Sequence, residues 1–273
     1  MPISKKNSYK ITILTSVSIA TIGILILFLL NAPLIINAFN AVEGLFQVTI
    51  IIIIRIIILS LTTIYLLKKW FKQEAQYLSD IPFLLSLFFL ILTFGKAIDL
   101  FWDITFNLFS ETIVLLLLKI RFIIIVLEVA PLIYLGLEIL FFRLEDKYQK
   151  LKSKTYMDKL RLRIILLIVI IELTAIIITS DYNTLGVMLP FIVIPSLLGI
   201  VYIFFLAYRL NRLTVVKPKI LTIGFLLYLI SNILRPVIQN ILGENASYIS
   251  LAELIDIIVF LVIFMGLYKK TNG

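Results

Sequence analysis

The stretch LFQVTIIIIIRIIILSLTTIYLL, residues 45–67, decides the fold class. Arg55 is its single charged residue, and it lies between the isoleucine runs Ile50–Ile54 and Ile56–Ile58. In a soluble protein a short β-branched run could form a buried strand, but a run of this length matches the roughly 20 residues with which a helix crosses a bilayer core of about 30 Å. The stretch therefore predicts a membrane-spanning helix.

The composition extends this prediction to the whole chain. Hydrophobic residues make up 62% of the 273 residues, and the mean hydropathy is +1.12. A water-soluble domain has a smaller apolar share, because it cannot hide so much apolar surface from water. The net charge of +9 could indicate nucleic acid as a partner, but the bases cluster at predicted membrane boundaries and not in one patch. We therefore predict the lipid bilayer as the partner, and no nucleic acid.

The chain contains no cysteine and no histidine. This excludes disulfides, thiolate nucleophiles, histidine-ligated metals and Ser-His-Asp catalysis. Carboxylates and amines remain, and they form no recognisable catalytic motif. We predict no catalytic residues, no metal site and no cofactor. An enzyme acting on lipid-linked substrates is the least favoured function.

Eight apolar stretches predict one all-α transmembrane domain that covers residues 1–273, a polytopic helical bundle. The first stretch follows Lys5–Lys10 and could be a secretory signal, but its apolar part is too long for that and no small-residue cleavage site follows. If it were removed, seven helices would remain. The predicted spans are 11–32, 45–67, 81–106, 112–142, 163–180, 187–208, 219–241 and 249–268.

The charged residues between the spans predict the orientation. Twenty of the 25 bases lie at 5–10, 68–72, 143–163, 209–219 and 269–270, which fall on one side of an eight-helix bundle. By the positive-inside rule this side is cytoplasmic, so both termini lie in the cytoplasm of a multi-pass cell-membrane protein. The opposite connections carry no base, and they contain Glu43, Glu111, Asp181 and Glu244.

Each half of the chain, about 11–142 and 163–268, would make four passes. A parallel four-plus-four repeat would fit this pattern, as in bundles with a pseudo-axis along the membrane normal. Within the basic segment 143–163 the bases are typical of a solvated face that contacts anionic headgroups. The same segment could also dock a cytoplasmic signalling partner.

Ionised residues also lie inside the predicted spans. Each costs at least about 2.5–3.5 kcal/mol at the bilayer centre, so these residues must pair or face water. Lys96 and Asp99 lie three residues apart on one helical face, and Arg121 and Glu128 are aligned seven residues apart. Arg55 has only apolar neighbours, so its partner must come from another helix. We predict an outward-facing polar pocket for a small or amphiphilic ligand, with the ligand-binding residues Arg55, Lys96, Asp99, Arg121, Glu128, Glu172, Asn232, Arg235 and Asp256.

The same charges have a structural alternative. A fully satisfied network of salt bridges could do no more than lock the helices together, because buried ion pairs also specify packing. The sequence leaves the two interpretations open.

Three motifs resemble the seven-helix membrane sensor region of some histidine kinases. They are Phe94–Asp99, Leu118–Phe122 and Ala130–Tyr134. The resemblance covers about 45–268, and the chain departs from that family by an added first helix and by the lack of a kinase. The resemblance implies a sensor bundle whose output passes through a separate protein.

Two functions therefore compete. The first is a non-enzymatic sensor or receptor-like module, in which the pocket binds the ligand and segment 143–163 relays the change to a partner. The second is a small-solute transporter or lipid flippase, which Arg55 and Glu172 near mid-membrane and the prolines in or beside the spans would support. A one-sided pocket favours sensing, whereas a cavity open to alternate sides favours transport.

Overall fold

A computed structural model describes residues 5–105, 108–211, 213, 216–243 and 245–268 of the chain. Within these residues the regular secondary structure is helical and includes no strand, which confirms the predicted all-α class. Eight of the helices have 22 to 34 residues. They are α1 (Lys5–Leu30), α3 (Leu45–Phe71), α4 (Ile81–Thr105), α5 (Glu111–Leu144), α6 (Lys154–Ile178), α7 (Tyr182–Arg209), α8 (Pro218–Leu242) and α9 (Ala246–Leu267).

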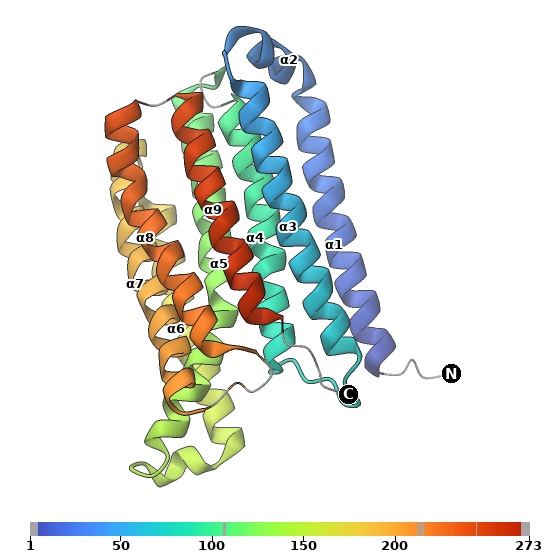
Figure 1. The fold of residues 1–273 in the computed structure, drawn as a ribbon, viewed down its shortest axis with the longest axis vertical. Helices are drawn as coiled ribbons and strands as arrows, with labels where there is room; N and C mark the ends of the chain where they lie inside the picture. Colours follow the sequence, from blue (N-terminus) through green and yellow to red (C-terminus); the bar gives the residue numbers. More distant parts are fainter. Residues whose placement is uncertain (1–4, 106–107, 212, 214–215, 244, 269–273) are drawn as a thin grey trace.

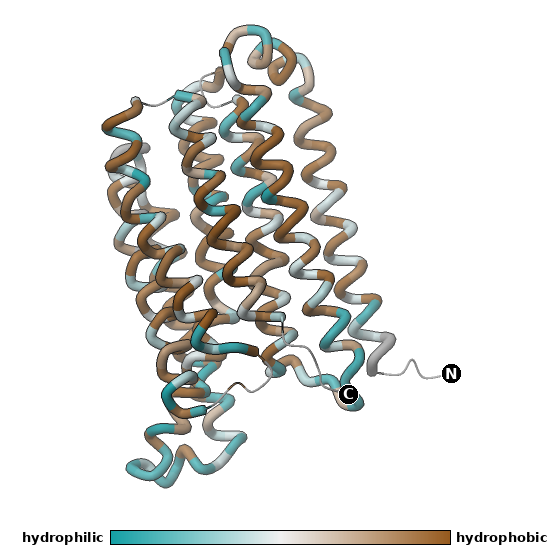
Figure 2. Tube along the Cα trace, viewed as in Figure 1, coloured by the Kyte–Doolittle hydropathy of each residue, from teal (hydrophilic) through white to brown (hydrophobic). Residues whose placement is uncertain are grey.

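The helices identify a multi-pass membrane protein. In the described part of the chain, six of them, α1, α3, α4, α7, α8 and α9, are long and apolar enough to cross a membrane. Figure 2 shows the apolar residues running along the helices, with hydrophilic residues gathered towards the two ends of the bundle. The helices α5 and α6 are also long, but they are not among these six. The predicted total of eight crossings therefore stays a prediction.

One short helix was not predicted. The sequence predicts only a connection after the first span, but Ala32–Ala41 form the helix α2, with a proline in its first turn. Ala38 of α2 is buried in a small apolar cluster with Val48 of α3 and Leu100 of α4. Ten residues are too few to cross a bilayer, so α2 caps the end of the bundle to which α1 and α3 lead (Figure 1).

Six helices form a closed ring. Each packs against the next in the order α3, α4, α5, α7, α8, α9, and α9 packs against α3 again. The other two long helices lie outside the ring, α6 on α5 and α1 on α4 (Figure 1). None of the most apolar part of α1 is buried within the described structure. The ring is therefore the part of the molecule that can enclose a site.

The half of the ring away from α2 is filled by apolar side chains. Phe88 of α4, Phe204 of α7, Phe225 of α8 and Phe260 of α9 belong to one buried cluster. The rings of Phe204 and Phe225 stack with centroids 5.1 Å apart. Near the same end the backbones of α8 and α9 come close, and the backbone N–H of Lys217 donates to the carbonyl of Gly266 at 2.8 Å.

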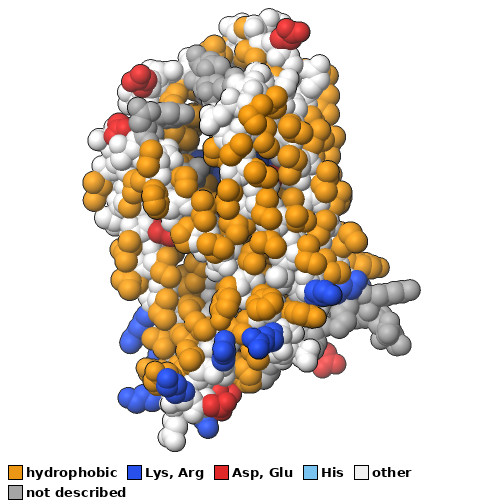
Figure 3. Space-filling model, turned by 60° about the vertical axis from the view of Figure 1, so that its left-hand side comes forward, with side chains coloured by type: hydrophobic (Ala, Val, Ile, Leu, Met, Phe, Trp, Pro, Cys, Tyr) orange, Lys and Arg blue, Asp and Glu red, His pale blue; other side chains and the backbone are white. Residues whose placement is uncertain are grey.

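The two ends of the bundle differ in charge. The start of α1, the end of α9 and the α5–α6 connection all lie at the lower end in Figure 1, whereas α2 lies at the upper end. On the face in Figure 3 lysine and arginine gather at the lower end, below a broad apolar surface. This arrangement matches the predicted base-rich side, and the predicted cytoplasmic location of that side stays a prediction. Arg212, Lys269 and Lys270 of the predicted set lie outside the described residues.

Most of the basic segment 143–163 is helical. The apolar stretch ends near residue 142, yet α5 continues to Leu144, and α6 begins at Lys154, nine residues before the predicted start of that span. A short 3-10 helix, Gln149–Lys152, lies between them. The basic segment and the adjoining turns of α5 and α6 thus form a helical hairpin, which we call the α5–α6 hairpin (residues 139–165). It projects below the other helices in Figure 1.

Candidate functional site

Charged side chains from five helices of the ring meet at one level. Arg55 of α3, Lys96 of α4, Arg121 of α5 and Asp256 of α9 all lie about 15 Å from the ends of their helices on the α2 side, at 1.5 Å per residue. Because these helices run in both directions, their sequence positions give no direct sign of this common depth. The ring therefore gathers these four charged groups into one layer in its interior.

Arg55 lies at the centre of this layer. Its Nη1 atom lies 2.8 Å from Oε2 of Glu253 and 2.8 Å from Oδ2 of Asp256. Its guanidinium also lies over the ring of Phe260, with 5.1 Å between its Cζ atom and the ring centroid. The side chain is only 3% exposed. The partner expected from another helix is thus a pair of carboxylates on α9.

Lys96 and Arg121 continue the network towards α5. The Nζ atom of Lys96 lies 2.6 Å from Oε1 of Glu253 and 3.4 Å from Oδ2 of Asp99. Arg121 donates from Nε to Asp99, and its Nη1 atom lies 3.7 Å from Oε2 of Glu128. Both predicted helical pairs, Lys96 with Asp99 and Arg121 with Glu128, are therefore present.

A glycine makes room for this arrangement. A Cβ atom added to Gly95 would lie 2.8 Å from Nη1 of Arg121 and 3.1 Å from Cγ2 of Ile124. No side chain larger than hydrogen fits between α4 and this guanidinium without a shift. Gly95 thus brings α4 close to α5 at the depth of the charged layer.

Helix α8 adds the fourth cation. Arg235 donates to Asp256, and its Nη2 atom lies 3.7 Å from Oε1 of Glu253. The hydroxyl of Ser231 donates to Oδ1 of Asp256 at 2.6 Å. Asp256 is fully buried and interacts with side chains of both α3 and α8, so it holds both helices against α9.

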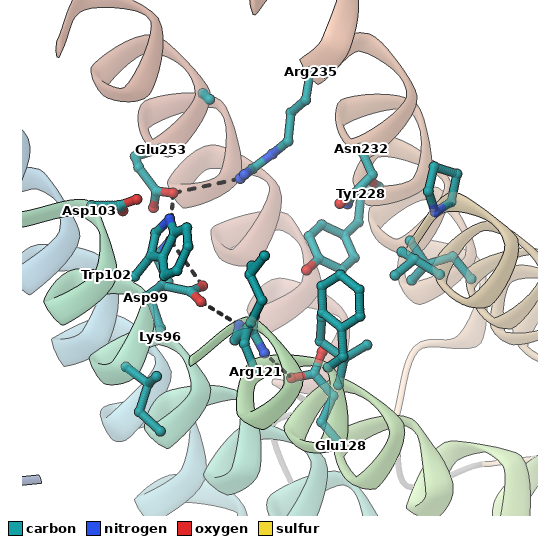
Figure 4. Close-up of a pocket in the computed structure, with 18 of the residues that line it drawn as sticks. Lys96, Asp99, Trp102, Asp103, Arg121, Glu128, Tyr228, Asn232, Arg235 and Glu253 are labelled. Carbon is teal, nitrogen blue, oxygen red and sulfur yellow. Dashed lines mark hydrogen bonds and ion pairs between the residues drawn. The ribbon is translucent and has the colours of Figure 1, made fainter. Parts of the chain in front are cut away.

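A cavity of about 530 Å³ lies against this network. Figure 3 shows a hollow in the upper half of the bundle, with blue lysine or arginine atoms visible between apolar side chains. Figure 4 shows charged groups from α4, α5, α8 and α9 around one space, with Tyr228 facing Arg121. The opposite wall is apolar and includes Pro190, Val193, Ile194 and Leu197 of α7. The cavity is therefore amphipathic.

The cavity ends at the apolar core. Phe88, Val129 and Leu197 line it and also belong to the buried cluster that fills the half of the ring away from α2. In the described residues the lining reaches the helix ends on the α2 side, at Asp103 of α4, Gln239 of α8 and Tyr248 of α9. In this conformation the cavity is thus one-sided.

Some polar atoms at the cavity keep unused hydrogen-bonding capacity. Nη1 of Arg121, Oε2 of Glu128 and Nε of Arg235 are buried without a hydrogen-bond partner. Such atoms are costly unless something else satisfies them. No group of three or more acidic side chains in the described chain is arranged to hold a metal ion. The arrangement can bind and orient a polar group.

Most of the predicted ligand-binding residues come together. Arg55, Lys96, Asp99, Arg121, Glu128, Asn232 and Arg235 line the cavity, and Asp256 is ion-paired with two of them. The structure does not bring Glu172 to the site. It is half-buried on α6, which packs outside the ring against α5. The position of Glu172 along its helix predicts a mid-membrane depth. This position does not show whether the helix belongs to the ring or packs outside it.

Other residues of the site are absent from the predicted set. Glu253 contacts Arg55, Lys96 and Arg235, so among the described residues it is the anion that pairs with the most cations. Its spacing of three residues from Asp256 places both on one helical face, and this signal could have found it. Trp102, Asp103 and Tyr248 also line the cavity. The residues of the apolar wall on α7 cannot be recognised from the sequence, because most residues of that helix are apolar.

A second charged cluster lies near the α5–α6 hairpin. Arg161 of α6 is 1% exposed, although the sequence analysis counts it among the bases of a solvated segment. Its Nη1 atom lies 2.6 Å from Oε2 of Glu138, its Nη2 atom pairs with Asp158, and its guanidinium lies 4.3 Å from the ring centroid of Tyr134. The α5–α6 hairpin is thus tied together by a buried arginine.

Comparisons with protein-family models, with curated proteins and with solved structures found no match for this chain.

Proposed function

We propose that this membrane protein is a non-enzymatic sensor that binds an amphiphilic ligand in the cavity between α4, α5, α7, α8 and α9. The observation that carries the proposal is the cavity itself, with charged groups on one wall and apolar side chains on the other. Ligand pockets combine a mostly apolar lining with a few polar groups that fix orientation. A ligand with a polar head and an apolar tail matches both walls.

The closed inner half supports sensing over transport. Alternating access needs a path to the second side of the membrane, and the buried cluster of Phe88, Phe204, Phe225 and Phe260 fills the ring below the cavity. A one-sided pocket can report on the outer side without passing its ligand on.

Helix α5 supplies a route for the signal. It runs unbroken from Glu111 to Leu144, carries Arg121 and Glu128 at the cavity, and carries Glu138 at the α5–α6 hairpin. Pro131 lies within α5, between the cavity and the hairpin. Proline in a helix removes one backbone hydrogen bond and can allow bending there. A ligand that displaces Arg121 can thus tilt the lower part of α5 and move the hairpin, where we place the contact with a cytoplasmic partner.

The resemblance to histidine-kinase sensor regions agrees with this proposal. The seven long helices α3 to α9 lie within residues 45–267, which is the range that the resemblance covers. Two of its motifs supply residues of the cavity, Lys96 and Asp99 in one and Arg121 in the other.

A transporter or lipid flippase is the second candidate, and one observation favours it. Pro190 on α7 and Pro236 on α8 both lie within helices and line the cavity. Bending at these positions could open the inner half of the ring.

The test combines binding with flux. The purified protein, in an uncharged detergent, is heated with each of four octyl compounds that differ only in the head group: octanoate, octyl phosphate, octyltrimethylammonium and octyl glucoside. A ligand that binds the folded state raises the melting temperature. Any compound that does so is then followed across the membrane of vesicles that contain the protein.

Sensing predicts that at least one head group stabilises the protein and that its flux equals that of empty vesicles. Stabilisation with protein-dependent flux would replace the sensor by a transporter. If none of the four compounds stabilised the protein, the proposal of an amphiphilic ligand would be wrong.

A further inference from the structure

The charges at the cavity do not balance. Four cations, Arg55, Lys96, Arg121 and Arg235, face five carboxylates, Asp99, Asp103, Glu128, Glu253 and Asp256. With all of them ionised the described layer carries one net negative charge. An uncompensated charge at this depth is unfavourable, because hydrocarbon and apolar protein solvate it poorly.

Each cation already pairs with carboxylates. Arg55 and Arg235 each contact Glu253 and Asp256. Lys96 contacts Glu253 and Asp99. Arg121 contacts Asp99 and, more distantly, Glu128. An anionic ligand that bound one of these guanidinium groups would compete with the carboxylates that already pair with it.

Two carboxylates at the cavity have a distant cation partner or none. Asp103 lines the cavity and forms no ion pair or hydrogen bond with the residues that the structure describes. Glu128 is 5% exposed and lines the same cavity, and its Oε2 atom lies 3.7 Å from Arg121 with no hydrogen-bond partner. In Figure 4 Asp103 lies beside Trp102 and Glu253, with no dashed line to a partner. The negative charge that remains therefore sits at the cavity wall, where a ligand can reach it.

The neighbouring side chains suit a cation. Trp102, Tyr228 and Tyr248 line the cavity, and aromatic rings attract ammonium groups through their π faces. The apolar wall of α7 lies across the same space and can hold an alkyl chain. A bare inorganic cation would leave most of the cavity and all of this apolar wall unused.

We propose that the ligand of this cavity is a monocationic amphiphile, an alkyl ammonium compound whose head group is held by Asp103, near the α2-side end of α4, and whose chain lies along α7. This assignment rests on the proposed function, and it specifies the chemical class of the ligand. One bound ammonium group brings the charged layer to neutrality.

The test uses octyltrimethylammonium as the probe and measures its dissociation constant by titration calorimetry on the whole protein in an uncharged detergent. Two variants each remove one negative charge at the cavity, Asp103→Asn and Glu128→Gln. The matched control is Glu172→Gln, which removes a carboxylate from a half-buried position on α6 outside the ring. The melting temperature without probe shows whether each variant is folded.

We expect the wild-type chain and Glu172→Gln to bind the probe with the same affinity, and Asp103→Asn to bind it about tenfold to a hundredfold more weakly. Glu128→Gln, whose side chain lies deeper in the cavity and beside Arg121, should weaken binding less. Asp103→Asn breaks no ion pair among the described residues, and if it did not fold, Asp103→Ser would decide the outcome.

Other outcomes separate this inference from the proposed function. If octanoate or octyl phosphate bound and octyltrimethylammonium did not, the cavity would be a ligand site and the cationic class would be wrong. If sodium chloride raised the melting temperature of the protein as much as the probe did, the occupant would be an inorganic cation. Unchanged affinity in a folded variant without the charge of Asp103 would also overturn the assignment. If no octyl compound bound the wild-type chain, the proposed function itself would fail.

Discussion

Arg55 shows how a single charge is accommodated in an isoleucine-rich helix. At the bilayer centre an arginine costs about 2.5–3.5 kcal/mol even on insertion scales. Two carboxylates of α9 and the face of Phe260 replace the water that the guanidinium loses. Each partner is itself buried, so the removal of one member leaves the others uncompensated.

The first prediction follows from this dependence. Arg55→Met should lower the free energy of unfolding by about 3–5 kcal/mol, because Glu253 and Asp256 would lose their shared cation in a buried site. This loss corresponds to a fall in melting temperature of roughly 6–20 °C in detergent. Ile57→Met, on the half-exposed face of the same helix, should change it little. Equal melting temperatures for the two variants would contradict the structural role of Arg55.

The spacing of charged residues predicts the contacts within one helix and misses those between helices. Lys96 with Asp99 and Arg121 with Glu128 follow from helical periodicity, and both are observed. The pairing of Arg55 with α9 depends on which helices are neighbours, and the sequence does not state this. Because the sequence does not show which helices are neighbours, it also predicts Glu172 as a residue of the site, although α6 lies outside the ring.

At the scale of the helices, small residues set how closely α8 and α9 approach. A Cβ atom on Gly266 would lie 2.8 Å from Cδ2 and 3.1 Å from the backbone nitrogen of Leu221. A Cβ atom on Gly224 would lie 2.6 Å from Cγ1 of Ile263. The two glycines thus hold the inner ends of α8 and α9 together, below the cavity.

The second prediction compares two glycines. Gly266→Ala should cost about 1–3 kcal/mol of stability, because the backbone of α8 cannot move aside as a flexible side chain would. Gly23→Ala on α1, where nothing lies within 4 Å of the added atom, should leave stability unchanged or raise it by about 0.5–1 kcal/mol. Thermal unfolding followed by circular dichroism measures both. A neutral Gly266→Ala would show that α8 and α9 are not held at this distance.

The ends of the helices were harder to predict than their existence. Apolar length marks each long helix, but it does not mark the charged turns by which α5 and α6 extend into the hairpin. Arg161 belongs to such a turn, and its burial depends on Glu138 and Tyr134 of the neighbouring helix. The short helix α2 has too few apolar residues to resemble a span, and it is held by packing on α3 and α4.

For the whole molecule, the sequence predicts which connections share a side but not how the ring closes. The alternation of basic and base-free connections places the α5–α6 hairpin and the chain ends together, as the structure does (Figure 1). Contact between α3 and α9, which lie far apart in the chain, completes the ring. That contact includes the ion pairs of Arg55 with its α9 carboxylates and the packing of Tyr65 on Phe264, and the sequence leaves both pairings open.

The third prediction concerns orientation in the cell membrane. The chain has no cysteine, so a single introduced cysteine can be labelled without a background signal. Glu43→Cys, exposed after α2, should react with a membrane-impermeant maleimide in intact cells. Lys147→Cys, exposed in the α5–α6 hairpin, should react only after permeabilisation. Labelling of both positions from outside would refute the predicted topology.

The measurement that bears most directly on the proposed sensor is the distance between the α5–α6 hairpin and a fixed point at the same end of the bundle. Spin labels at Lys150→Cys in the hairpin and at Glu74→Cys after α3 occupy exposed positions. Addition of octyltrimethylammonium should shift the distance distribution in the otherwise unchanged chain, and the shift should be absent when Asp103→Asn is also present. If the probe bound and the two distributions stayed identical, occupancy of the cavity would not reach the hairpin, and the sensor mechanism would be contradicted.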